Sequence, residues 1–254
     1  MSNIDKLFVM NNAVVIIDFD NYFQKDINEY SKEQIESLFL KIIDYISIHN
    51  DVMQINFRLY GGWYQDDDLT NRASVVFQKI SNIDIFPHII NQNKRIFGDI
   101  QIVYNLYGID YIWHNTYREK KGIPRLRINH TAKGDKCDSR KNICPVHILS
   151  KFTRNKDKIC LNEGCMTKHS DIFFQREQKM VDTMIACDLL SYCEESSTNC
   201  LYLISDDMDH FPALALCHKK KEELPIFVGI KNVQNIVNYS SILENFNIKI
   251  FQLS

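Results

Sequence analysis

The chain has 254 residues, of which 45% are apolar and 24% are charged, with 8 glycines and 5 prolines. This composition excludes collagen-like and wholly disordered chains, and the length allows one large domain or one domain with an insertion. No apolar run approaches the ~18 residues that a membrane span requires. The first residues lack the pattern of a signal peptide, so we expect a cytoplasmic protein with no membrane partner, whose eight cysteines are reduced.

Charge is distributed unevenly along the chain. The net charge is -2, but residues 116–158 contain 13 Lys and Arg against 4 Asp and Glu, which gives this segment a charge of +9. The other residues together carry -11. A basic segment in an otherwise acidic chain predicts a polyanionic partner, and the acidic remainder predicts a cation site. A solvated basic loop is the alternative interpretation of the segment.

On both sides of that segment, strand patterns alternate with helix patterns. Residues 13–18 are a continuous apolar run, typical of a buried strand. In residues 32–49 the apolar positions recur at helical spacing, and Ser31 is a candidate N-cap. Residues 99–116 have the pattern of a hairpin around Tyr107 and Gly108. Further strands are predicted at 52–64, 199–205, 225–230 and 248–253, and further helices at 69–80, 176–194, 210–220 and 232–245.

This alternation predicts an α/β fold in which a parallel sheet is covered by helices on both faces. Periodicity is lost between residues 117 and 170, where Lys, Arg, Cys and Asn dominate. We therefore expect residues 1–85 and 175–254 to form one α/β domain. Residues 86–174 are expected to interrupt it as an inserted hairpin followed by a basic segment rich in Cys and His.

Carboxylates follow two of the predicted strands. The first strand ends at Asp18, and a later strand ends at Ser205, before the acidic run Asp206-Asp207-Met208-Asp209. The helix that precedes the later strand contributes Asp182. Sites in parallel α/β sheets form at the carboxyl ends of strands, and several carboxylates that meet there require a cation such as Mg²⁺ or Mn²⁺. A single acid at such a position is more simply explained as a helix cap.

The same residues resemble a known family. The segments VVIIDFDN, QKMVDTMIACDLL and YLISDDMDHFPAL are similar to motifs of the NYN domains, the LabA-like group of PIN-fold ribonucleases. The resemblance covers residues 13–83 and 176–230. It implies a PIN-like, Rossmannoid fold and a metal-dependent endoribonuclease that hydrolyses the phosphodiester bonds of RNA. The RNA partner, tRNA or another structured RNA among the candidates, stays open, as does a homodimer.

The resemblance also implies roles for individual residues. The catalytic carboxylates that hold one or two Mg²⁺ or Mn²⁺ ions would be Asp18, Asp182, Asp207 and Asp209. The supporting residues would be Asn21, Ser205, Asp20, Asp188 and Lys179. The chain departs from the family at three positions: Met180 and Asp206 stand where glycine is usual, and His210 stands at an aromatic position.

Cysteine and histidine cluster within the basic segment, which predicts a structural zinc ion. The first ligand set combines Cys144, Cys160 and Cys165 with His169, in the manner of a CCCH finger. Two other sets keep the three cysteines and replace His169 by His147 or by Cys137. Zinc would supply the folding energy that so polar a segment cannot obtain from apolar burial. Reduced thiols that bind no metal are the alternative.

The insertion would hold RNA through its positive charge. Tyr111, Trp113 and Tyr117 could stack on unpaired bases, although packing against the sheet is the simpler role for them. The basic residues expected to contact phosphates are Lys120, Lys121, Arg125, Arg127, Lys133, Arg140 and Lys141.

Two other functions compete with a ribonuclease. A haloacid-dehalogenase-like phosphatase also carries a D-x-D motif after its first strand, as Asp18-Phe19-Asp20 does here, but Tyr22 departs from its usual Thr or Val. That family also gives no role to Asp182. An RNA-binding adaptor would bind through the insertion and use the α/β domain as a scaffold, so it would not depend on Asp207.

Overall fold

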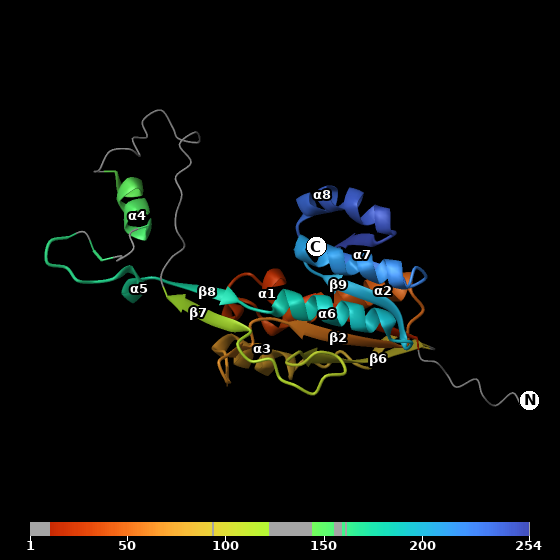
Figure 1. The fold of residues 1–254 in the computed structure, drawn as a ribbon. Helices are drawn as coiled ribbons and strands as arrows, with labels where there is room; N and C mark the ends of the chain where they lie inside the picture. The colour runs from red at the N-terminus through yellow and green to blue at the C-terminus, as the bar shows by residue number, and fades with distance from the viewer. Residues whose placement is uncertain (1–10, 93, 122–143, 155–158, 161, 254) are drawn as a thin grey trace, which may run out of the picture. The chain divides into compact units, whose positions relative to one another are not determined.

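The computed structural model describes residues 11–92, 94–121, 144–154, 159–160 and 162–253, apart from the side chains of residues 169 and 176. The chain divides into two compact units. The first unit comprises the residues up to Tyr117 and those from Gln178 onward, and the second comprises Arg118–Glu177. Figure 1 shows that the first unit contains the central sheet and the helices packed on it.

The first unit is built around a seven-stranded sheet with the strand order β11-β10-β9-β1-β2-β6-β5. Every neighbouring pair is parallel except β5 with β6, which is antiparallel. This arrangement confirms the predicted α/β class with a mostly parallel sheet. The strands are β1 (Asn12–Asp18), β2 (Gln54–Tyr60), β5 (His88–Asn91), β6 (Lys94–Ile102), β9 (Thr198–Ile204), β10 (Ile226–Ile230) and β11 (Lys249–Gln252).

Alternating residues of β1 supply two separate apolar cores. Val15 and Ile17 pack with α2 and α3 on one face of the sheet, whereas Val14 and Ile16 pack with α6 and α7 on the other. Because both faces of β1 are buried, its sequence is continuously apolar rather than alternating. The helices are α2 (Lys32–His49), α3 (Asn71–Ile80), α6 (Val181–Glu194), α7 (Phe211–Lys220) and α8 (Val233–Leu243).

Local signals set the starts of two helices. The Ser31 hydroxyl accepts a hydrogen bond from the backbone N–H of Gln34, and the Gln34 side chain accepts one from the N–H of Ser31. This reciprocal capping box satisfies two N–H groups that a helix start leaves unpaired. Thr70 caps α3 in the simpler way, by accepting from the N–H of Ala73 at 3.1 Å. The predicted N-cap at Ser31 is therefore confirmed.

The order of the parallel strands changes direction at β1. The chain places β2 and β6 on one side of β1 and then places β9, β10 and β11 on the other side. In open α/β sheets, ligands bind at the carboxyl ends of the strands where the order reverses. Asp18 is the last residue of β1, and Ser205 directly follows β9. Both residues therefore lie at the expected binding edge of the sheet.

Residues 86–117 belong to the first unit, whereas the sequence prediction placed them in the insertion. β6 pairs in parallel with β2 and thus extends the central sheet. The described residues that follow it, 103–116, form no strand, so the predicted hairpin over 99–116 is wrong. The strand pattern of β6 corresponds to a strand that pairs with β2 and β5. Such a pattern predicts a strand but does not show whether its partner strand is close in the sequence.

The second unit contains more regular structure than its aperiodic sequence suggests. The strands β7 (Tyr117–Lys121) and β8 (Phe174–Gln178) form a two-stranded sheet where the chain leaves and re-enters the first unit. Two helices are described between them, α4 (Pro145–Arg154) and α5 (His169–Ile172).

Among the helices that the structure describes, none has both the length and the apolar composition of a membrane span. α2 reaches 18 residues, but it is amphipathic, and charged side chains such as Glu33, Glu36 and Lys41 lie outside its buried apolar face.

Candidate metal centre

Asp18 is the innermost acid at the carboxyl edge of the sheet, with 3% of its surface exposed. The side chain caps the short helix α1 (Phe19–Tyr22) by accepting from the Asn21 N–H at 3.3 Å. Its other oxygen, Oδ2, accepts from the Ser205 hydroxyl at 3.1 Å. A buried carboxylate needs such donors because its charge is poorly solvated. Asp18 is therefore held in a fixed orientation by Asn21 in α1 and by Ser205 directly after β9.

Asp182 approaches Asp18 from the first turn of α6. Met180, which precedes the helix, has a φ of 63°, in the left-handed region that favours glycine. This turn directs the chain from β8 into α6. Met180 therefore carries a side chain at a position whose backbone conformation favours glycine.

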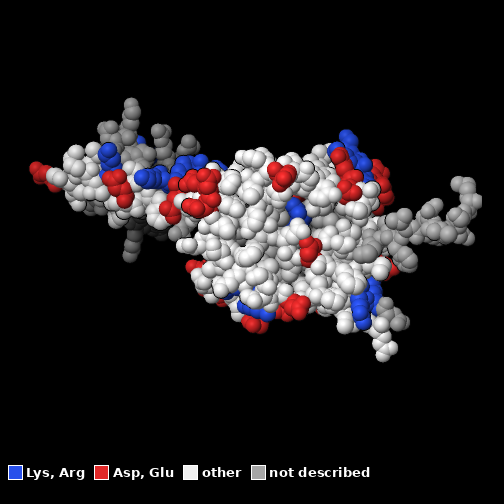
Figure 2. Space-filling view, turned by 90° about the horizontal axis from the view of Figure 1, so that it is seen from below, with Lys and Arg blue, Asp and Glu red and all other residues white. Residues whose placement is uncertain are grey.

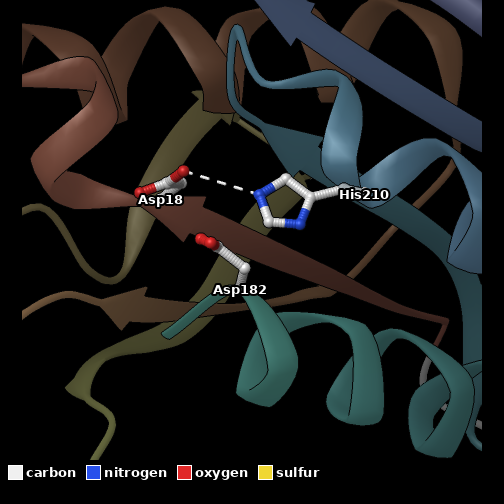
Figure 3. A group of neighbouring side chains, drawn as sticks. All are labelled: Asp18, Asp182 and His210. Atoms are coloured by element: carbon white, nitrogen blue, oxygen red, sulfur yellow. Dashed lines mark hydrogen bonds and ion pairs between the residues drawn. The ribbon is translucent and has the colours of Figure 1, made fainter. Parts of the chain in front are cut away.

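His210 completes a group with these two carboxylates. One ligand atom from each of Asp18, Asp182 and His210 lies within 4.8 Å of the other two. Figure 3 shows the three side chains converging from the end of β1, the start of α6 and the segment before α7. His210 is fully buried, and its Nε2 lies 3.5 Å from Oδ2 of Asp18. This is the one group of three or more such side chains, within the described parts of the chain, that could share an ion.

Asp207 and Asp209 border this group. The Asp207 N–H donates to the Ser205 hydroxyl at 3.1 Å, and the Asp207 carboxylate accepts from the Asp209 N–H at 2.9 Å. Partial burial raises the pKa of Asp182 above its ordinary value, and the negative charges of Asp18, Asp207 and Asp209 raise it further, against a lowering by His210. Asp182 is therefore close enough to the other three predicted catalytic acids to be affected by their charges.

Asn21 and Ser205 hold the strand ends together. The Asn21 side-chain oxygen accepts from the Asp206 N–H at 3.0 Å, which ties the end of β1 to the loop after β9. The Asp206 carboxylate in turn accepts from the N–H groups of Lys231 and Asn232 beyond β10. Asp206 is thus engaged as a loop anchor, and these contacts fit the supporting roles predicted for Asn21 and Ser205.

Asp20 is engaged elsewhere. Its carboxylate forms an ion pair with Arg72 at 2.5 Å and accepts from the Gly62 N–H at 2.8 Å and from the Gln178 side chain. Arg72 also donates to the carbonyl oxygen of Phe23 at 2.6 Å. With its oxygens occupied by these donors, Asp20 fixes the loop after β1 and does not join the group of Asp18.

Asp188 lies away from the group, on the buried side of α6. Its carboxylate pairs with the Arg58 guanidinium at 2.9 Å and accepts from the Tyr60 hydroxyl and from the Tyr107 N–H. Arg58 faces a cavity of about 1090 Å³ over β2 and β6, lined also by Asn56 and Gln101. Asp188 therefore neutralises a buried arginine. No local pattern predicts this pairing, because Arg58 stands in an otherwise ordinary strand.

Lys179 precedes α6 and is exposed. Its backbone N–H donates to the carbonyl oxygen of Thr116 at 2.9 Å. From the sequence, His210 stands out only as a departure from the aromatic residue of the resembling family, and no ligand role is predicted for it. Its place directly after the acidic run, in D-H-F-P, is the signal that could have suggested a ligand.

The second unit holds two of the predicted zinc ligands close together. Cys160 and Cys165 flank a turn closed by an antiparallel bridge between Ile159 and Lys168, and Gly164 supplies a positive φ of 75° just before Cys165. Hydrogen bonds from Thr167, followed by one from Cys160, lower the pKa of Cys165. Cys144 and His147 lie on the first turn of α4. Cys137 and the side chain of His169 are outside the described residues.

Two predicted RNA-binding residues lie on β7. Lys120 is 3.4 Å from Glu177 on β8, next to a closer ion pair between Arg118 and Glu177 at 2.8 Å. Lys121 is exposed. On the face shown in Figure 2, most of the described surface of the first unit is uncharged. The other predicted phosphate contacts, Arg125, Arg127, Lys133, Arg140 and Lys141, lie outside the described residues.

Comparison with protein-family models, with curated proteins and with solved structures finds no match for this chain. The resemblance of its motifs to the NYN family therefore stays a prediction. The geometry at the carboxyl edge of the sheet is the basis on which a function can be argued.

Proposed function

We propose that this protein is a metal-dependent ribonuclease whose active centre is the group of Asp18, Asp182, Asp207 and Asp209. The observation that carries the proposal is the convergence of Asp18 and Asp182, from β1 and α6, on one point at the edge where the strand order reverses. Repulsion between such carboxylates is costly unless a cation neutralises it. The position and the charge together favour a centre that binds metal.

The residues present fit a divalent ion. Ligand atoms around an ion with bonds of about 2.1 Å lie roughly 3–4 Å apart, which is compatible with the spacing of at most 4.8 Å in this group after small side-chain movements. Burial and the nearby carboxylates raise the pKa of Asp182, so a cation at this position would favour its ionised form. An ion bound here would lower the pKa of a bound water and offset charge on the phosphodiester oxygens, as Mg²⁺ and Mn²⁺ do.

The protein residues would contribute orientation. The Ser205 hydroxyl fixes Asp18 and also receives the N–H of Asp207, so one side chain sets the positions of two acids. Asn21 and Asp206 lock the two strand ends against each other. Asp182 is open to solvent, which leaves a route for a substrate phosphate to the carboxylates.

RNA is proposed as the substrate, with the second unit as its holder. The charge of +9 over residues 116–158 supports binding of a polyanion. The turn that brings Cys160 and Cys165 together supports zinc binding in this unit. Two cysteines on a turn and a Cys-x-x-His pair at a helix start are ligand arrangements that structural zinc sites use.

The phosphatase alternative has less support. Such an enzyme needs the second Asp of its D-x-D motif at the substrate, whereas Asp20 is engaged by Arg72, Gly62 and Gln178. An RNA-binding adaptor would not need Asp18 and Asp182 to converge. The cleavage experiment below distinguishes an adaptor from a ribonuclease.

The test is cleavage of labelled single-stranded RNA, tRNA, single-stranded DNA and double-stranded DNA by the full-length protein with Mg²⁺, Mn²⁺ or chelator. We expect RNA cleavage that requires the ion and that Asp207→Asn reduces by at least about a hundredfold without loss of RNA binding. The matched control is Asp44→Asn, which changes an exposed acid on α2. Equal cleavage by the parent and by Asp207→Asn would contradict the assignment.

A further inference from the structure

His210 has no assigned chemical role in the proposed ribonuclease, yet it is the most deeply buried member of the metal group. None of its surface is exposed, and it lies in the turn between Asp209 and α7. Figure 3 shows its ring directed at the space between Asp18 and Asp182. A buried imidazole aimed at two carboxylates is either a hydrogen-bond donor that positions one of them or a ligand of an ion that they share.

The contacts of Asp18 argue against a donor as the main role. Asp18 already accepts from the Ser205 hydroxyl at 3.1 Å and from the Asn21 N–H at 3.3 Å. The distance of 3.5 Å from His210 Nε2 to Asp18 Oδ2 exceeds the usual N–H···O range of about 2.7–3.2 Å. His210 therefore adds a weak third contact to a carboxylate that already has closer donors.

The other ring nitrogen also lacks a partner. Nδ1 of His210 is buried and makes no hydrogen bond with any part of the chain that the structure describes. Buried polar atoms are normally paired, so the single long contact of Nε2 requires an explanation. An ion between the three side chains would replace this contact by a bond to Nε2, but it would not pair Nδ1, which lies on the other side of the ring.

We propose that His210 is a nitrogen ligand of the centre and makes it select transition-metal ions over Mg²⁺. Oxygen ligands alone suit Mg²⁺, whereas imidazole favours first-row transition metals. Replacing an oxygen ligand by nitrogen therefore raises the affinity for Mn²⁺ relative to Mg²⁺. This inference rests on the metal centre of the proposed function but not on RNA being the substrate.

The experiment measures metal binding without substrate. Full-length protein, depleted of Mg²⁺ and Mn²⁺, is titrated with each ion, and the Mn²⁺ complex is studied by pulsed electron paramagnetic resonance. We expect Mn²⁺ to bind at least about tenfold more tightly than Mg²⁺ and to show the ¹⁴N coupling of a bound imidazole. Manganese suits this measurement because cysteine thiolates, such as those of the second unit, are poor ligands for it.

His210→Phe retains a buried ring and removes the ligand, and His210→Gln offers an oxygen instead. Both are expected to abolish the ¹⁴N coupling and to reduce the preference for Mn²⁺ over Mg²⁺ about tenfold or more. Mn²⁺ that binds the parent protein without ¹⁴N coupling would overturn the role of His210 and leave the carboxylate centre intact. If neither Mn²⁺ nor Mg²⁺ binds, both the inference and the metal centre are overturned. The parent spectrum alone decides the question if both variants misfold.

Discussion

The Ser205 hydroxyl donates to the Asp18 carboxylate at 3.1 Å, although 187 residues separate the two in the sequence. The same hydroxyl receives the N–H of Asp207 at 3.1 Å. One small side chain at the end of β9 therefore orients acids from both halves of the first unit. Its removal should weaken ion binding as well as lower stability.

Ser205→Ala is expected to lower the free energy of unfolding by about 2 kcal/mol, because it removes a donor to a buried carboxylate and an acceptor for the Asp207 N–H. Mn²⁺ affinity should fall as well, by about tenfold or more, because groups that orient a metal ligand typically have effects of this size. Ser47→Ala, which removes a hydroxyl bonded to the Ile43 carbonyl within α2, is the control. Urea denaturation and ion titration give the two values. Unchanged ion affinity in Ser205→Ala would contradict this role.

Met180→Gly is expected to stabilise the protein. Met180 has a φ of 63°, which costs a side-chain-bearing residue about 1 kcal/mol or more and costs glycine little. The greater flexibility of glycine in the unfolded chain offsets part of this gain, so we expect about 0.5 kcal/mol in net stability. Met180→Ala retains the Cβ atom and should give no gain. Thermal unfolding of the two variants side by side provides the measurement.

Asp182→Asn should stabilise the metal-free protein at neutral pH by up to about 1 kcal/mol. Burial, together with the neighbouring carboxylates, raises the pKa of Asp182, so its ionised form is less favourable in the folded than in the unfolded state. That cost is present above the folded-state pKa and vanishes below about pH 4, where the carboxyl is protonated in both states.

Urea denaturation at pH 7.5 and at pH 4.5, in buffer free of Mg²⁺ and Mn²⁺, tests this expectation. The advantage of Asp182→Asn over the parent should shrink as the pH falls. In the presence of Mn²⁺ the order should reverse, because the ion stabilises only the protein that binds it. If the stability advantage of Asp182→Asn over the parent grows as the pH falls, the predicted direction of the pH dependence is wrong.

Asp188→Asn is expected to be strongly destabilising and to leave ion affinity unchanged. The substitution leaves the buried Arg58 guanidinium without its counter-charge, which typically costs about 3–5 kcal/mol. The double variant Arg58→Met, Asp188→Leu removes both charges and should recover most of this loss. Denaturation measures the expected loss of stability, and Mn²⁺ titration of the folded variants tests whether ion affinity is unchanged. A weakened Mn²⁺ affinity in folded Asp188→Asn would show that Asp188 supports the metal centre after all.

Cys160→Ser is expected to remove a zinc ion from the second unit. Elemental analysis of the parent should give about one zinc per chain, and the variant should give none. RNA affinity should fall with the zinc, since the metal supplies the folding energy of this segment. Cys187→Ser, in α6, is the control and should retain the metal. A parent protein without zinc would contradict the ligand assignment.

Short-range patterns predicted the fold well. The apolar run of β1 and the periodicity and N-cap of α2 are local signals, and both elements appear where the sequence places them. β6 shows the limit of such signals. Its pattern identifies a strand, but its pairing with β2 depends on residues more than thirty positions away.

Part of the candidate centre can be predicted because local patterns identify the strand ends and the helix that carry its acids. Strand order places Asp18 and Ser205 at one edge, and the spacing of α6 adds Asp182. Asp20 and Asp188, predicted as supporting residues, are instead each engaged by an arginine from elsewhere in the chain, Arg72 and Arg58 respectively, and the local pattern does not reveal such pairings. Burial of His210 was equally invisible, since it depends on how α7 packs against α6.

The hydrogen bond between the Lys179 N–H and the Thr116 carbonyl, at 2.9 Å, has a consequence for how the chain tolerates change. This hydrogen bond joins the two segments of the first unit that lie directly before and directly after the second unit in the sequence. Because the ends of the long excursion are already adjacent, altering its length changes the closure entropy only logarithmically. The second unit could therefore vary in length or be exchanged while the first unit kept the arrangement of its carboxylates.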